Sequence, residues 1–190
     1  MRRRAFLGGC GATTAGATAG CLNSVPVLGN DGGIDTSSPE MIVESYVETV
    51  AASGGLPDSA EEMFHSTIVD NTRIGDEVDR EPPGEFESSL VEMQGPAVAL
   101  RGLSKSKLRS LSRSWRVLAR EFTPPDGFVS ELAVGETALV DVRFTVKTTF
   151  ERESGTQTSE FTRDIRVTTA VEDGDWQIVS STFVGGPGSG

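Results

Sequence analysis

The sequence predicts an α+β fold in which N-terminal helices pack against an antiparallel sheet. Between residues 39 and 53, apolar side chains recur every three or four positions, which is the period of a helix that buries one face. From residue 136 onward, apolar and polar side chains alternate, which is the period of a half-buried strand. Because the two patterns follow one another instead of interleaving, helices and strands are expected to segregate in space.

The first twenty residues predict an export signal. Three arginines precede an uncharged run (5–20) that is too short and too rich in Gly and Thr to span the ~30 Å core of a bilayer. Arg3, Arg4, Phe6 and Leu7 resemble the twin-arginine motif, which a receptor reads as an address. The resemblance implies export of a folded protein, and an ordinary secretory signal is the alternative.

Cys21 is predicted to carry a lipid. The preceding residues Thr18, Ala19 and Gly20 resemble a lipobox, which implies cleavage before Cys21 and acylation of its sulfur. Because one acyl chain holds a protein weakly and two hold it stably, a double modification is expected. Cys10 leaves too few residues before it for a signal. The expected location is the outer face of the cell membrane, and the alternative is an unmodified Cys21 beyond a plain cleavage site.

The charge of the mature chain is strongly negative. Removing residues 1–20 takes away three of the 17 Lys and Arg and none of the 28 Asp and Glu, which leaves a net charge of −14. Only three of the basic residues are lysine, and this composition resembles that of proteins from salt-loving archaea. Salt screens such self-repulsion, since the Debye length falls to ~3 Å at 1 M. The same charge argues against nucleic acid as a partner.

Few residues could support metal or nucleophilic chemistry. With Cys21 acylated and Cys10 removed, the mature chain keeps no free thiol, and His65 is its only histidine. This argues against zinc sites, histidine metal clusters and a Ser-His-Asp triad. No metal and no cofactor are therefore expected.

One helix is predicted between Ser38 and Gly54, after a tether (21–38) rich in Gly, Ser and Asn. Ser38 can cap the helix, and Pro39 and Glu40 suit its first turn. Its apolar stripe consists of Ile42, Val43, Tyr46, Val47 and Val50. A second helix is predicted over 58–69, with the stripe Ala60, Met63, Phe64 and Ile68.

The acidic segment 70–85 partly matches a calcium loop. Asp70, Gly75 and Glu81 stand at positions 1, 6 and 12 of that pattern, but Ile74 at position 5 cannot bind a cation. A solvated acidic loop is the preferred interpretation.

Residues 101–120 form the one basic segment, with no acidic residue between Glu92 and Glu121. Its cations are Arg101, Lys105, Lys107, Arg109, Arg113, Arg116 and Arg120. The spacing fits one amphipathic helix, which could lie on an anionic membrane, or a short helix (104–112) followed by a strand (114–122). The cations could dock to a membrane or an acidic partner. The preferred interpretation is that they pair with the protein's own carboxylates.

The last third predicts an antiparallel meander. In 136–152, Ala138, Val140, Val142, Phe144 and Val146 alternate with polar residues, and in 161–172 the inward residues are Phe161, Ile165, Val167 and Val171. A loop is expected at 153–159. Asp173-Gly174 predicts a tight hairpin turn before a closing strand at 176–184, and 185–190 is a predicted disordered tail.

The segments VGETALVDVRFTV (134–146) and EDGDWQIVSS resemble the NTF2-like (cystatin-like) superfamily. The resemblance covers 39–184 and implies a curved sheet that wraps the helices and leaves a cone-shaped cavity. It also favours a strand at 114–122. Some members of this superfamily are isomerases or dehydratases, and many pair their sheets with a protein partner, so a homodimer is a candidate assembly.

Five residues are candidates for the cavity: Tyr46, His65, Trp115, Arg163 and Trp176. Tyr46 and the tryptophans are expected mainly in the core, His65 at the rim or surface, and Arg163 in an ion pair at the sheet edge. The preferred function is a lipid-anchored module that binds a small ligand or a protein. The alternatives are a cavity enzyme acting on a small apolar substrate, which would need a titratable group such as His65 or Asp70 in an apolar pocket, and a membrane module using 101–120.

Overall fold

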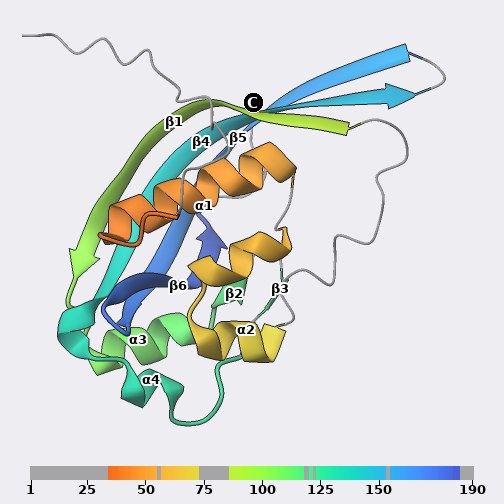
Figure 1. Cartoon of the computed structure of the whole chain (residues 1–190). Helices are drawn as coiled ribbons and strands as arrows, with labels where there is room; N and C mark the ends of the chain where they lie inside the picture. Colours follow the sequence, from red (N-terminus) through yellow and green to blue (C-terminus); the bar gives the residue numbers. More distant parts are fainter. Residues whose placement is uncertain are drawn as a thin grey trace, which may run out of the picture. The chain divides into compact units, whose positions relative to one another are not determined.

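The computed structural model describes residues 34–54, 57–72, 86–117, 120–121, 123–152 and 155–184. The predicted signal, the lipobox, Cys21, the tether up to residue 33, the tail and all but the start of the proposed calcium loop lie outside these residues. The elements are α1 (Pro39–Ser53), the 3-10 helix η1 (Asp58–Met63), α2 (Ser66–Thr72), β1 (Phe86–Arg101), α3 (Lys105–Ser112), β2 (Arg116–Val117), β3 (Arg120–Glu121), α4 (Phe128–Glu131), the 3-10 helix η2 (Val134–Glu136), β4 (Thr137–Arg152), β5 (Gly155–Glu172) and β6 (Asp175–Phe183) (Figure 1).

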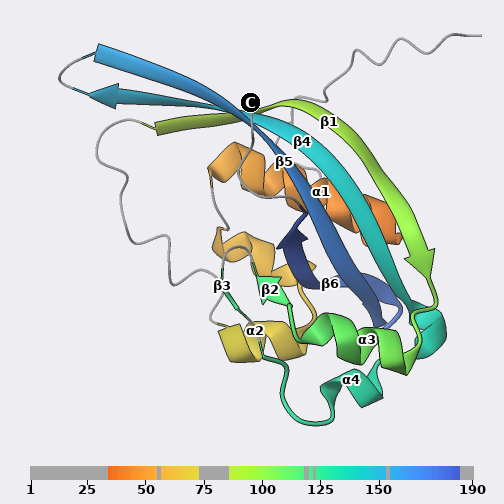
Figure 2. The same ribbon diagram turned by 180° about the vertical axis from the view of Figure 1, so that it is seen from behind.

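Four strands form an open antiparallel sheet in the order β1-β4-β5-β6. Helix α1 lies on one face, and the strands curve around it, as the views from both sides show (Figures 1 and 2). We call the face toward α1 the inner face and the opposite one the outer face. The predicted α+β fold, with a helix packed on an antiparallel sheet, is confirmed.

Helix α1 has the predicted ends. Ser38 Oγ accepts a hydrogen bond from the Met41 N–H at 3.2 Å, and Gly54 closes the helix in a left-handed conformation with φ of 70°. A Cβ at Gly54 would lie 2.2 Å from a ring carbon of Phe86, so the glycine also lets the start of β1 approach the end of α1. The apolar stripe faces the sheet, and Ile42, Val43 and Val47 are fully buried.

The prediction of a single second helix is wrong. The chain forms η1, then an extended break at Phe64 and His65, and then α2. Phe64 makes a parallel bridge with Ile178 of β6, and the His65 N–H donates to the Ile178 carbonyl at 3.0 Å. This strand-like pairing draws the backbone out of the helical conformation although the apolar spacing suits a helix.

Strand β1 was not anticipated from the sequence. Its side chains are half-buried or exposed throughout, and Gly95-Pro96 interrupts its alternation. Its pairing with β4 shifts register at three places, between Leu90 and Glu92, Gln94 and Ala97, and Val98 and Leu100. Tertiary pairing with β4, rather than a local pattern, therefore defines this strand.

Strands β4 and β6 and the Asp173-Gly174 turn appear as predicted, with positive φ at both turn residues. Strand β5 begins at Gly155, so the loop expected at 153–159 is wrong for 155–159. Residues 155–159 pair with the end of β4, and the last pair of this ladder is Gly155 with Arg152. The β-branched Thr156 and Thr158 favour this extended conformation.

The segment after α3 is neither one amphipathic helix nor one continuous strand. Helix α3 ends at Ser112, as the split interpretation predicts, and two short strands follow. Arg116 of β2 pairs with Glu121 of β3, and Val117 pairs with Arg120. The predicted strand at 114–122 is therefore replaced by a small separate hairpin.

Candidate functional site

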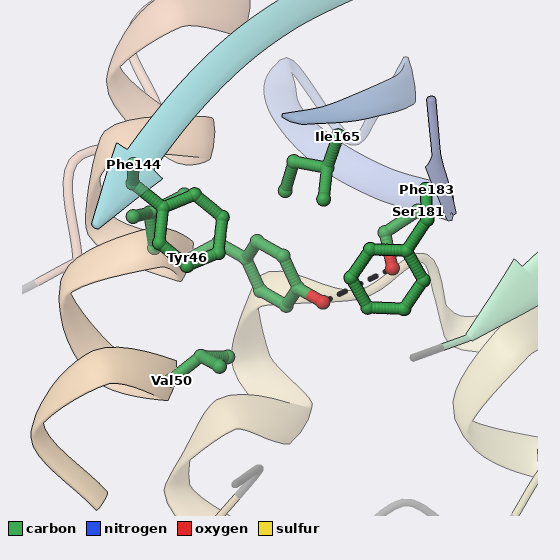
Figure 3. Close-up of a pocket in the computed structure, with 7 residues that line it drawn as sticks. Tyr46, Val50, Phe144, Ile165, Ser181 and Phe183 are labelled. Carbon is green, nitrogen blue, oxygen red and sulfur yellow. Dashed lines mark hydrogen bonds between the residues drawn. The ribbon is translucent and has the colours of Figure 1, made fainter. Parts of the chain in front are cut away.

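The cavity considered as the candidate site lies between α1 and the inner face of the sheet. Helix α1 contributes Tyr46, Val47 and Val50, and the strands contribute Phe144, Ile165, Ser181 and Phe183 (Figure 3). The elements place these side chains together because Tyr46, Val47 and Val50 share one helix face and Phe144 and Ile165 point inward from neighbouring strands. The cavity volume is about 40 Å³.

Tyr46 is the main polar group of this cavity. The side chain is 3% exposed, and its hydroxyl forms a hydrogen bond with Ser181 Oγ at 3.0 Å (Figure 3). Burial raises the pKa of Tyr46 to about 12, although the bond to Ser181 acts in the opposite direction. The phenol therefore keeps its proton throughout the neutral range and is unsuited to act as a general base there.

The cavity is small for a substrate. Sites for small organic molecules usually measure about 300–1,000 Å³, whereas this volume has room for about one or two waters. Neither His65 nor Asp70 lines it. Asp70 lies exposed on α2, so the expectation that it could act inside an apolar pocket is wrong. Apart from Tyr46, the described residues that line this cavity offer no acid–base group to a substrate.

His65 is more buried than expected for a residue at the rim or surface. Its side chain is 13% exposed, and the ring stacks edge-on against Phe128 with centroids 4.9 Å apart. Burial lowers the pKa of His65, although Glu172 and Glu131 raise it. The neutral ring is favoured, since its Nδ1 accepts a hydrogen bond from the Thr67 N–H at 3.3 Å.

The neighbours of His65 do not form a nucleophile–base pair. Ser66 Oγ donates to Glu172 Oε1 at 2.5 Å, and the Ser66 N–H donates to Glu172 Oε2 at 2.8 Å. A serine nucleophile needs its hydroxyl bonded to the histidine, whereas here it is bonded to the carboxylate. Glu172 instead satisfies the backbone at the start of α2, which is a structural role.

The other predicted cavity residues lie elsewhere. Trp115 is 2% exposed and contacts Phe128 in the core, and Trp176 is partly buried after the hairpin turn. Arg163 points inward from β5 opposite Phe144, but its guanidinium lies over the ring of Phe161, 5.1 Å from the centroid. The expected ion pair of Arg163 is not found with any carboxylate of the described chain.

The seven basic residues of 101–120 have different surroundings. Arg101 pairs with Glu40 at 3.1 Å, as predicted for pairing with the protein's own carboxylates. Lys105 Nζ donates to the carbonyls of Val129, Ser130 and Leu132 at the end of α4. Three further cations, Lys107, Arg109 and Arg113, are exposed, and no described carboxylate pairs with them. Arg116 is half-buried in β2, and the side chain of Arg120 lies outside the described part of the chain.

Four cavity residues were not singled out from the sequence: Phe144, Ile165, Ser181 and Phe183. The alternation identified Phe144 and Ile165 as inward-facing, but not as neighbours of Tyr46. No local signal identifies Ser181, which contacts Tyr46 although the two residues are 135 positions apart in the sequence.

Within the described residues, no group of three or more His, Cys, Asp or Glu side chains could hold a metal ion. No described helix is long and apolar enough to cross a membrane.

Comparison with known proteins gives little further information. No protein-family model and no curated protein matches the sequence. Among solved structures, the chain is similar to the intermembrane space region of the chloroplast protein ARC6, with 12% identity and a TM-score of 0.30. The match covers 53% of this chain and 56% of that one, so the chain spans about half the length of the solved structure. This similarity is too weak to indicate a fold or a function.

Proposed function

We propose that this chain is an exported, lipid-anchored module of NTF2-like type that binds a second copy of itself through its sheet. The observation that carries the proposal is the length of the sheet relative to its helix. The 15 residues of α1 span about 22 Å, whereas the 16 residues of β4 span about 54 Å. The strands therefore run well beyond the helix (Figures 1 and 2).

We call the end of the sheet that lies beside and beyond Gly54 the arm, which consists of 86–90, 146–152 and 155–161. Its inner face carries an apolar strip of Phe86, Leu90, Phe150 and Phe161, all half-buried. The rings of Phe86 and Phe150 are 5.0 Å apart. Aromatic side chains that are only half covered in the monomer are suited to the centre of a protein interface.

The outer face is less suited to this role. Arg166 and Asp141 form a two-bond ion pair there, at 2.6 and 2.7 Å, and Thr145 bonds with Thr162 at 3.0 Å. These polar groups already satisfy one another and would have to lose water on binding. The inner face of the arm is thus the better interface.

The NTF2-like assignment is supported by the helix on the inner face and by the closing hairpin that precedes Trp176. Members of that superfamily often pair through their sheets, which favours a homodimer. The small cavity favours binding over catalysis.

The interface is tested by replacing neighbouring residues on opposite faces of β4. Phe150→Asp places a charge in the apolar strip, and Thr149→Asp places the same charge on the outer face. We expect the parent chain and Thr149→Asp to sediment as dimers and Phe150→Asp to sediment as a folded monomer. A monomeric parent chain, or a Phe150→Asp variant that remains dimeric, would contradict the proposed interface.

The anchor is tested by replacing each cysteine in turn. After a high-salt wash of membranes from cells that express the complete chain, Cys10→Ser should stay in the membrane fraction. Cys21→Ser should be found in the soluble fraction, because the acyl chains that hold the protein are attached to its sulfur. Retention of Cys21→Ser, or release of both variants, would show that Cys21 is not the anchor.

A further inference from the structure

Helix α3 and the residue after it carry three exposed cations that pair with no carboxylate of the described residues. Lys107, Arg109 and Arg113 are exposed, and none forms an ion pair with a described carboxylate. This is unexpected in a chain with 28 acidic and 17 basic residues. Leu108, between Lys107 and Arg109 in the sequence, is fully buried, so α3 is fixed with that side toward the core while the three cations remain accessible to solvent.

The helix dipole accounts for two of these three charges but not for Lys107. A cation is favourable near the C-terminus of a helix, which suits Arg109 in the last turn and Arg113 just after it, but it is unfavourable in the first turn. Lys107 lies in the first turn, and that turn contains no acidic residue. Lys105, in the same turn, is used by the fold because it binds the carbonyls at the end of α4. Lys107 has no such contact among the described residues.

The start of α3 lies beside the point where the chain enters the domain. Arg101, which precedes α3, pairs with Glu40 in the first turn of α1. Upstream, the carbonyl of Thr36 accepts a hydrogen bond from the Trp176 N–H at 3.0 Å. The thirteen peptide units from Cys21 to Ile34 reach at most about 45 Å. Helix α3 can therefore touch a membrane to which Cys21 is attached.

We propose that Lys107, Arg109 and Arg113 bind the anionic headgroups of the membrane that holds the protein. The proposal rests on the lipid anchor at Cys21 given under the proposed function. It adds that the domain takes one orientation on the membrane. Helices α3 and α4 lie at one end of the sheet and the arm at the other (Figures 1 and 2). Contact through α3 directs the arm away from the membrane, where a second copy can reach its inner face.

The net charge of the chain is negative, but charges act on a membrane only within about one Debye length, which is ~8 Å at physiological salt. Carboxylates farther than this from α3 therefore oppose the contact only weakly. The two arginines can also form paired hydrogen bonds with a phosphate at short range. Tethering at Cys21 raises the effective concentration of the patch at the surface, so a weak contact suffices.

The test measures vesicle binding by the complete chain without its other membrane-binding groups. The parent protein carries Cys21→Ser and Gln in place of Arg2, Arg3 and Arg4. It is titrated with vesicles of equal parts phosphatidylglycerol and phosphatidylcholine, and with phosphatidylcholine alone. We expect binding to the anionic vesicles only. Replacing Lys107, Arg109 and Arg113 with Gln should weaken it roughly a hundredfold at low salt, about fivefold for each cation.

The matched control removes three cations from the strands. Replacing Arg143, Lys147 and Arg166, which lie on the outer face away from the apolar strip, with Gln changes the net charge equally and should leave binding within a few-fold of the parent. Equal weakening by both triple variants, equal binding to neutral vesicles, or no binding by the parent would overturn the proposal. The vesicle assay uses protein without a lipid on Cys21, so such a result would not contradict the lipid anchor. The anchor is tested separately by the membrane fractionation of Cys21→Ser.

Discussion

Tyr46 is the only tyrosine of the chain, so its ionisation can be followed without interference from another tyrosine. In the folded protein its pKa is raised to about 12, because the ring is buried and the phenolate would lose its hydration. An ultraviolet titration of the native protein should show no phenolate near pH 10, whereas the protein unfolded in urea should ionise there. A native transition near pH 10 would mean that the hydroxyl is exposed to water.

The same shift affects stability at alkaline pH. The pKa of Tyr46 is higher in the folded protein than the value of 10 in the unfolded chain. The protonated phenol therefore stabilises the fold fully below pH 10, and this stabilisation is lost as the pH rises toward 12. Two pKa units correspond to roughly 3 kcal/mol. The contribution of His65 to stability depends on pH in the opposite sense. Because burial lowers its pKa below 6.5, the neutral ring stabilises the fold fully above that pH, and this stabilisation is lost as the pH falls.

At the level of single residues, burial was easier to predict than contacts. The helical stripe predicted that Tyr46 faces the core, and it is buried there. Its partner Ser181 could not be predicted, because the contact depends on the path of β6 across the sheet. The burial of His65 was missed for a similar reason, since Phe128 covers it from a distant helix.

Secondary structure could be predicted where one face of an element is buried. The alternation in 136–152 predicted β4 because its inward residues meet a helix and its outward residues meet water. Strand β1 escaped prediction because it lies at the sheet edge and buries neither face well. The helix predicted over 58–69 is interrupted by the bridge between Phe64 and Ile178, which the local pattern does not reveal. Both departures come from pairing between distant parts of the chain.

Lys105 connects helices α3 and α4 by hydrogen bonds. Lys105 of α3 donates to three carbonyls at the end of α4, whereas Lys107 of the same helix is exposed. Replacing Lys105 with Met should lower the free energy of unfolding in urea by about 1–3 kcal/mol, since these carbonyls lose a charged donor. Lys107→Met is the matched control and should change it by less than about 0.5 kcal/mol. Equal effects of the two substitutions would refute the bridging role of Lys105.

For the whole molecule, the sheet extends beyond α1, and the cavity beside Tyr46 is small for a substrate. The sequence identified 101–120 as a basic segment, but it could not predict that Lys107, Arg109 and Arg113 are exposed and pair with no described carboxylate. That grouping depends on α3 ending at Ser112 and burying Leu108. The proposed arrangement has three levels: an anchor at Cys21, a basic helix on the membrane, and an arm directed away from it.

The central claim is that the sheet, and not the cavity, is the functional surface. Native mass spectrometry of the protein extracted from its own membranes in high salt tests this claim most directly. We expect the mass of two chains that each begin at an acylated Cys21, with no further organic molecule bound. A monomer that retains a small organic ligand would contradict the claim and make the cavity beside Tyr46 the functional site.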